Sequence, residues 1–132
     1  MRNAWIFVLA FLIGTPLVLA AGKKPPMQRA HTRIPVTVRV DFGPANKPTV
    51  EQQFDVDEGS TPKDAVSLLV PIQSGEVCCD TREVLAIDGV RPDPAKNWWW
   101  NCRLNGTSTV SAHKTQLKAG DTVEWFYHEV LQ

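Results

Sequence analysis

The segment from Asn97 to Tyr127 constrains the fold of this 132-residue chain more than any other part of it. It carries four of the five tryptophans, three of them in the run Trp98-Trp99-Trp100. It also contains two turn signals, Asn105-Gly106 and Gly120-Asp121. An Asn-Gly pair suits a tight turn that needs a positive φ, and Gly-Asp suits a chain reversal. The segment therefore predicts strands joined by tight turns, with indole rings on the strands.

The first half of the chain predicts an antiparallel hairpin. Residues 34–42 alternate between apolar and polar side chains, and residues 50–57 do so again. The residues between them, Gly43 to Pro48, have the composition of a turn. Strict alternation over this length indicates two strands with one buried face and one face in water.

A short helix is predicted directly after the hairpin. Thr61 fits the N-cap, Pro62 the first helical position, and Asp64 completes an approximate capping box. Pro71 should end the helix at about Val70, because the residue before a proline is pushed out of the α region. An apolar stripe at helical spacing would lie on the sheet. Its members are Ala65, Leu68, Leu69 and Ile72.

The order of elements indicates an α+β domain with one helix packed on a mixed sheet. Residues 109–118 fit either a short strand with a loop or a single helical turn. The strands expected after the helix are residues 77–79, 84–90, 97–104 and 122–130.

The N-terminal residues 1–21 predict an export signal peptide, followed by a flexible lead-in at 22–33 and the folded domain at 34–132. An arginine precedes an uncharged run at residues 4–20, and small residues follow it. The alternative is a retained membrane anchor. The run is shorter than the roughly 20 residues of a spanning helix and contains a glycine and a proline. We expect a secreted or periplasmic protein with no stable membrane insertion after cleavage.

The three cysteines would meet an oxidising compartment after export, where a disulfide is the default. A bond from Cys78 or Cys79 to Cys102 would contribute about 3 kcal/mol by loop-entropy arithmetic. One cysteine is left over. A metal site with His113 or His128, thiol redox chemistry and unpaired thiols are the alternatives. Adjacent cysteines lack the spacing of zinc ligands, and no Cys-x-x-Cys occurs.

Charge and motifs narrow the class of function. Basic and acidic residues number 14 each, so no basic excess indicates nucleic acid or an anionic membrane as a partner. No Gly-x-Ser-x-Gly, His-Glu-x-x-His or phosphate-binding glycine loop occurs. We expect neither an enzyme nor a metal protein.

Three motifs resemble the transcobalamin C-terminal-like domain family: VLAIDGV at 84–90, WNCRLNG at 100–106 and LKAGDTVEWFY at 117–127. The resemblance extends over residues 36–127 and includes the alternating first strand and the helix entry. It implies a β-grasp-like fold, similar to ubiquitin-like sulfur carriers and ligand-binding modules. In transcobalamin and intrinsic factor the equivalent domain caps a cobalamin held mainly by a separate α-domain. Cobalamin is thus implied here by resemblance alone.

The tryptophan run allows two interpretations. Trp98 and Trp100 should point to one face of a strand, and Trp99 and Asn101 to the other. Either the rings fill the core, or they form an aromatic surface for a planar or sugar ligand. We therefore expect an exported, non-catalytic binding module for a small molecule such as a corrinoid or a glycan. The alternative is a structural domain that docks to an exported protein partner. The candidate ligand-binding residues are Trp98, Trp99, Asn101, Trp125 and Tyr127.

Overall fold

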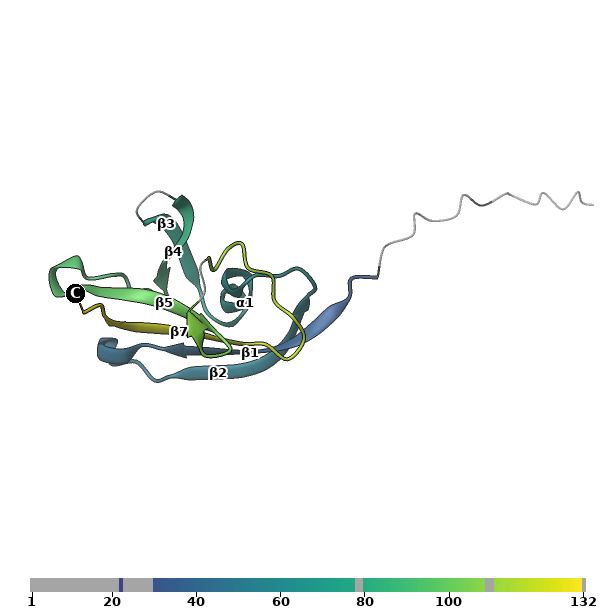
Figure 1. Ribbon diagram of the computed structural model, residues 1–132, viewed down its shortest axis with the longest axis horizontal. Coiled ribbons are helices and arrows are strands. Elements are labelled where there is room, and N and C mark those ends of the chain that lie inside the picture. The colour runs from purple at the N-terminus through teal and green to yellow at the C-terminus, as the bar shows by residue number, and fades with distance from the viewer. Residues whose placement is uncertain (1–21, 23–29, 78–79, 109–110, 132) are drawn as a thin grey trace, which may run out of the picture.

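A computed structural model describes residue 22 and the ranges 30–77, 80–108 and 111–131. The described chain forms a five-stranded mixed sheet, a separate two-stranded hairpin and one α-helix (Figure 1). The α+β architecture predicted from the sequence is confirmed.

The elements follow one another along the chain with short connections. Two single-turn 3₁₀ helices, η1 (Gly43–Ala45) and η2 (Pro94–Lys96), precede β2 and β5. The remaining elements are β1 (Arg33–Asp41), β2 (Val50–Asp57), α1 (Pro62–Leu69), β3 (Ile72–Val77), β4 (Asp80–Ile87), β5 (Trp98–Leu104), β6 (Thr107–Ser108) and β7 (Thr122–Glu129).

The first and last strands lie side by side in the middle of the sheet. The strand order is β2-β1-β7-β5-β6, in which β1 and β7 are parallel and every other pair is antiparallel. The predicted β1–β2 hairpin is confirmed, with Val36 opposite Phe54. All elements between β1 and β7 form the connection between these two parallel strands. Their pairing therefore joins the two ends of the domain.

One face of the sheet is the core, and the other is open. In β1 the side chains of Val36, Val38 and Val40 are buried, while the residues between them are half-buried. α1 and the β3–β4 hairpin lie over the same face of the sheet (Figure 1). The single covered face explains why the sequence alternates so regularly in β1 and β7.

The start and end of α1 agree with the prediction. Thr61 is the N-cap and forms a capping box with Asp64, whose backbone N–H donates to Thr61 Oγ1 at 3.2 Å. The Thr61 backbone N–H donates to Asp64 Oδ2 at 2.9 Å. The helix ends at Leu69, and Val70 is extended ahead of Pro71.

The predicted apolar stripe is shifted by part of a turn. Val66 is fully buried, whereas Leu68 is 66% exposed. Ile72 lies outside the helix, at the start of β3. The two-turn helix therefore buries the side that carries Pro62, Ala65 and Val66. The predicted stripe is therefore right for Ala65 and Leu69 and wrong for Leu68, because apolar spacing alone does not decide whether Val66 or Leu68 faces the sheet.

The strand after the helix begins earlier than predicted. β3 starts at Ile72, directly after Pro71, and pairs with β4 as a separate antiparallel hairpin that contains register shifts. Its residues Gln73, Ser74 and Gly75 give no apolar alternation, which is why only the end of the strand was expected. Residues 78–79, including the predicted end of that strand, lie outside the described residues.

The segment that the sequence left ambiguous contains a single helical turn within a loop in its described part, 111–118, because the Thr115 N–H donates to the Ser111 carbonyl at 3.1 Å. The Lys63 N–H donates to the Ala112 carbonyl at 2.9 Å, and the Leu117 N–H donates to the Ser60 carbonyl at 2.8 Å. Ala112 and Leu117 are buried. The loop therefore fastens the start of α1 to the sheet.

None of the helices in the described ranges is long and apolar enough to cross a membrane. The predicted signal peptide, 1–21, and most of the lead-in, 22–33, fall outside those ranges.

Candidate functional site

Four aromatic rings meet at one end of the sheet, on its core face. Trp100 packs against Phe42 with centroids 5.6 Å apart and planes at 83°, and against Tyr127 at 5.2 Å and 41°. Trp98 meets Tyr127 at 5.9 Å and 83°. The β5–β7 register places Trp100 opposite Tyr127, and the two-residue period of a strand brings Trp98 to the same face. We call Phe42, Trp98, Trp100 and Tyr127 the aromatic cluster.

Two hydrogen bonds hold the cluster against the loop that follows β4. The Trp100 indole N–H donates to the Val90 carbonyl at 2.8 Å, and the Tyr127 hydroxyl donates to the Arg91 carbonyl at 2.9 Å. Burial raises the pKa of Tyr127, and the nearby Asp93 carboxylate adds to the increase. The phenol therefore stays protonated and remains a donor.

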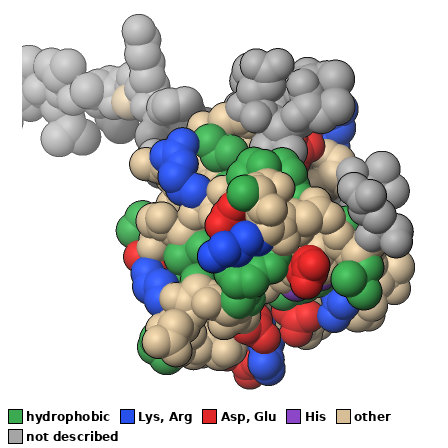
Figure 2. Space-filling model, turned by 90° about the vertical axis from the view of Figure 1, so that its left-hand side faces the viewer, with side chains coloured by type: hydrophobic (Ala, Val, Ile, Leu, Met, Phe, Trp, Pro, Cys, Tyr) green, Lys and Arg blue, Asp and Glu red, His purple; other side chains and the backbone are tan. Residues whose placement is uncertain are grey.

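A hollow of about 450 Å³ opens beside the cluster; we call it the end hollow. It is lined by Asp41, Gly43, Pro44, Trp98 and residues 126–129. Figure 2 looks at this end of the molecule and shows hydrophobic side chains interleaved with basic and acidic ones.

The end hollow exists because β1 is shorter than β7 at this end. The last paired residues are Asp41 and Phe126, so β7 continues to Glu129 without β1 beside it. η1 turns the chain close to β7: a Cβ on Gly43 would lie 2.2 Å from the Tyr127 carbonyl oxygen. Gly43 has a φ of 45° as well, so glycine meets both requirements.

Polar side chains from the open face reach the rim of the end hollow. The His128 ring is tilted on Phe126, with centroids 4.7 Å apart, and its Nε2 lies 2.8 Å from Asn101 Nδ2. Asp41 Oδ1 accepts a hydrogen bond from the Gly43 N–H at 2.9 Å. The rim therefore combines hydrogen-bonding groups with ring surface.

Basic side chains cover rings at this end. Lys96 Nζ lies 5.0 Å from the Trp98 ring centroid, and the Arg103 guanidinium lies 4.0 Å from that of Phe126. Lys47 Nζ lies 5.1 Å from the Phe42 centroid. Such cation–π contacts arise because the face of an aromatic ring carries a negative quadrupole.

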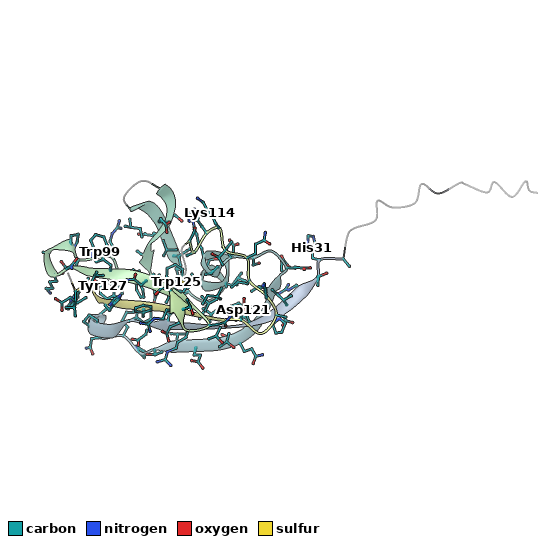
Figure 3. All side chains as sticks on the ribbon, viewed as in Figure 1. His31, Trp99, Lys114, Asp121, Trp125 and Tyr127 are labelled. Atoms are coloured by element: carbon teal, nitrogen blue, oxygen red, sulfur yellow. The ribbon has the colours of Figure 1, made fainter. Side chains whose placement is uncertain are left out.

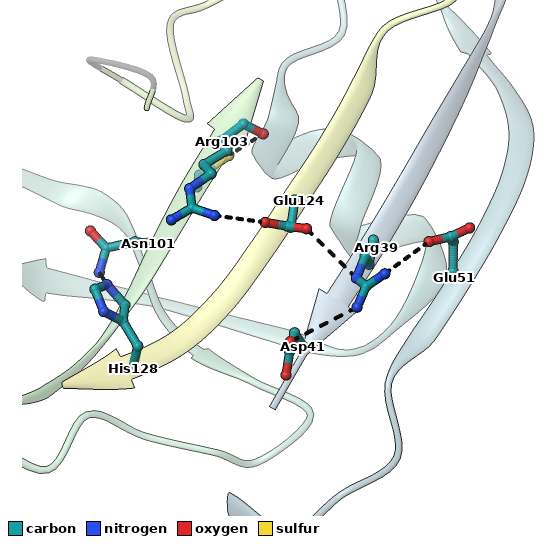
Figure 4. A network of polar contacts seen from close by, with 8 residues as sticks. Arg39, Asp41, Glu51, Asn101, Arg103, Glu124 and His128 are labelled. Carbon is teal, nitrogen blue, oxygen red and sulfur yellow. Dashed lines mark hydrogen bonds and ion pairs between the residues drawn. The ribbon is translucent and has the colours of Figure 1, made fainter. Parts of the chain in front are cut away.

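The open face of the sheet carries a row of alternating charges that crosses four strands (Figure 4). Glu124 lies between Arg103, at 3.3 Å, and Arg39, at 3.6 Å. Arg39 also pairs with Glu51 at 3.7 Å and with Asp41 at 4.0 Å. The row holds two arginines and three carboxylates, so it carries a surplus of one negative charge.

The five candidate residues from the sequence lie on both faces of the sheet. Trp98 and Tyr127 line the end hollow, whereas Trp99 and Asn101 project from the open face, where Asn101 contacts His128. The Trp99 N–H donates to Asn97 Oδ1 at 2.9 Å. Trp125 is only 3% exposed and lies below α1 (Figure 3), with its N–H 3.4 Å from the Pro62 carbonyl.

Six residues that line the end hollow were not among the sequence candidates: Asp41, Gly43, Pro44, Phe126, His128 and Glu129. They come from the end of the first strand, from η1 just after it, and from the end of the last strand. The Phe-Tyr-His run within β7 is the only local signal for them in the sequence. The two strand ends meet only through the β1–β7 pairing, which a local pattern does not reveal.

Cys102 is a free and buried thiol in the structure. Burial raises the pKa of this thiol to about 12, which leaves almost no thiolate near neutral pH. The predicted partners Cys78 and Cys79 lie outside the described residues, and the disulfide is not shown. Within the described ranges, no group of three or more His, Cys, Asp or Glu side chains is placed to hold a metal ion.

Residues 80–129 match the domain of unknown function DUF4430. This match runs from β4 to β7 and includes all three motifs quoted above. Together with the structural match to haptocorrin, it confirms the predicted resemblance to the transcobalamin-like family.

Two of the solved structures that share the fold are a bacterial protein and haptocorrin. A protein from Ruminococcus gnavus, provisionally described as metal-binding, matches with a TM-score of 0.58 and 24% identity, over 74% of this chain and 99% of that one. Haptocorrin in complex with Cbi matches with a TM-score of 0.62 and 14% identity. That match covers 86% of this chain and 28% of the haptocorrin chain. No curated protein matches the sequence of this chain.

Proposed function

We propose that this protein is an exported, non-catalytic binding module that holds a small molecule in the end hollow. The observation that carries the proposal is the hollow itself, with the ring of Trp98 in its lining and Tyr127 behind that ring. Its volume of about 450 Å³ falls within the roughly 300–1,000 Å³ of small-molecule sites.

The composition of the lining supports a ligand with an apolar ring and polar substituents. Trp98 and Phe126 offer ring surface, while Asp41, His128 and Glu129 offer hydrogen-bonding groups. The β7 backbone adds more, because Glu129 lies beyond the last β1 partner and presents its N–H and C=O groups to the side that β1 has left. A corrinoid and a glycan both combine ring surface with many amide or hydroxyl groups.

Two proteins that share the fold are consistent with a ligand of this class, and the likeness to them is one of fold only. The haptocorrin structure contains Cbi, and the R. gnavus protein is provisionally described as metal-binding. Within our proposal residues 34–132 form the binding domain, with a β-grasp-like strand order, and residues 1–21 direct export to the periplasm or the medium. N-terminal sequencing of the protein recovered from the cell envelope or medium would test the export step.

The five candidate contact residues differ in burial and in the face of the sheet from which they project. We propose a direct contact from Trp98, with Tyr127 supporting its ring from behind and Asn101 acting through His128. Trp125 is too deeply buried to touch a ligand, and Trp99 faces away from the aromatic cluster. These two tryptophans therefore serve as internal controls.

The test is a titration with cobinamide and with neutral and basic oligosaccharides, followed by calorimetry so that the readout does not depend on tryptophan. We expect Trp98→Ala to weaken binding at least tenfold. Trp99→Ala is the matched control, because it removes the same side chain from the next position on the opposite face, and it should bind as wild type. Equal loss in both variants, or no binding of any compound in the panel, would overturn the proposal.

The second candidate function is docking to an exported protein partner. The observation that favours it is Leu131, which is 83% exposed two residues after the hollow-lining Glu129. In this case Leu131→Ser should abolish capture of a partner from the cell envelope. Calorimetry would then detect no heat of binding for any of the small molecules.

A further inference from the structure

The described side chains that line the end hollow include acidic groups and no lysine or arginine. The acidic groups are the two carboxylates of Asp41 and Glu129. His128 is the remaining titratable side chain of the rim, apart from the phenol of Tyr127. An anionic ligand would therefore meet two like charges, whereas a cationic ligand would meet two opposite charges.

Both carboxylates retain free acceptor capacity. Glu129 is exposed and makes no side-chain hydrogen bond or ion pair with the described residues. Asp41 Oδ1 accepts from the Gly43 N–H, while Oδ2 has Arg39 only at 4.0 Å. An ionised carboxyl offers about four lone-pair sites. A ligand group can therefore be added without displacing a strong internal partner.

The aromatic rings of the hollow already hold positive groups. Lys96 lies over Trp98, and Arg103 lies over Phe126. Each of these cations also has a carboxylate partner outside the hollow, Asp93 for Lys96 and Glu124 for Arg103. The lysine lies on a mobile four-carbon stem, so a ligand cation can exchange with it at the Trp98 face.

We infer that the end hollow selects a positively charged ring compound, such as an amino sugar, over its uncharged counterpart. The inference rests on the proposed function and specifies its ligand class. A sugar ring stacks on Trp98, its ammonium group pairs with Glu129 or Asp41, and its hydroxyls bind the backbone groups of Glu129 that no β1 residue faces. Charge complementarity supplies the selectivity, and the ring contact is common to both compounds.

The experiment compares two trisaccharides of the same ring skeleton, chitotriose with free amines and its fully N-acetylated form. Binding to the full chain after signal removal is measured by calorimetry in mildly acidic buffer, at low and at high salt. We expect chitotriose to bind at least tenfold more tightly, with a preference that shrinks as salt is added. Glu129→Gln should reduce that preference severalfold, because it removes a negative charge that only the amine form can pair with.

Glu58→Gln is the matched control. Glu58 is exposed and follows β2 at the end of the sheet away from the hollow, so this change removes the same charge without touching the site. It should keep the full preference. Circular dichroism checks that Glu129→Gln folds, which its exposed position favours.

The outcomes separate this inference from the proposed function. Equal binding of the two trisaccharides, or a preference that survives both Glu129→Gln and Asp41→Asn, overturns the inference and leaves the binding module standing. Binding of cobinamide or another compound of the panel, with neither trisaccharide bound, also overturns the inference alone. If nothing in the panel binds, the proposed function fails as well.

Discussion

The Trp98 and Tyr127 rings meet edge to face, with centroids 5.9 Å apart and planes at 83°. Tyr127 is buried and fixed by its hydrogen bond to the Arg91 carbonyl, whereas Trp98 is half-buried at the rim of the end hollow. The contact therefore connects a rigid core residue to the surface that we propose for ligand binding. A ring held in this way loses little freedom when a ligand stacks on it.

Tyr127→Phe should lower the free energy of unfolding by about 1 kcal/mol, because the Arg91 carbonyl loses its donor while the ring packing remains. Urea denaturation measures the change. Tyr127→Ala is the comparison, and it should cost about 3 kcal/mol or more because it also leaves a cavity. A phenylalanine variant as unstable as the alanine variant would show that the hydroxyl, and not the ring, dominates.

The reduced protein should lose stability in alkaline solution through Cys102. Its thiol has a pKa of about 12 when folded, against 9.0 for an exposed thiol. Above that lower value the unfolded chain binds fewer protons than the native chain, so stability falls as the pH rises. The slope is roughly 1.4 kcal/mol per pH unit for this one group. The raised pKa of Tyr127 acts in the same direction.

Urea midpoints measured from about pH 8 to about pH 10.5 check this dependence. Cys102→Ala should remove part of the slope, although it lowers stability at every pH. Identical slopes in the two proteins would contradict a buried, protonated thiol at this position.

Two substitutions in α1 should differ sharply in their effect on the free energy of unfolding. Val66 is fully buried, so Val66→Ala should cost about 2 kcal/mol of unfolding free energy. Leu68 is 66% exposed, and Leu68→Ala should change stability by less than about 0.5 kcal/mol. Thermal melts of both variants measure this difference in stability. A larger loss of stability from Leu68→Ala than from Val66→Ala would show that α1 buries the face predicted from the sequence.

Glu124→Gln should destabilise the protein by about 1 kcal/mol at low salt, because Glu124 contacts two arginines and is partly shielded from water. The loss should shrink in high salt, since salt screens surface charges. Glu51→Gln is the control, because Glu51 is more exposed and contacts Arg39 alone. Equal losses for the two variants would argue against a connected row of charges.

Several features of the fold follow from residues close together in the sequence. The alternation in β1 and β2 sets the face to which Val36 and Phe54 point, and the Thr61–Asp64 capping box sets the start of α1. The Asn105-Gly106 turn has the positive φ values of 51° and 79° that its sequence demands. The two-residue period of β5 also separated Trp98 from Trp99 correctly. All these depend on steric and hydrogen-bonding preferences within a few residues.

The tertiary structure decided which face of each element is buried and where the hollow lies. Leu68 and Val66 are both apolar, and only the packing of α1 on the sheet determines that Val66 is the buried one. The end hollow requires β1 to stop beside Phe126 while β7 continues, and no local pattern encodes the pairing of the first strand with the last. Sequence periodicity specifies faces, whereas contacts between distant segments decide what covers them, because burial is a property of the assembled layers.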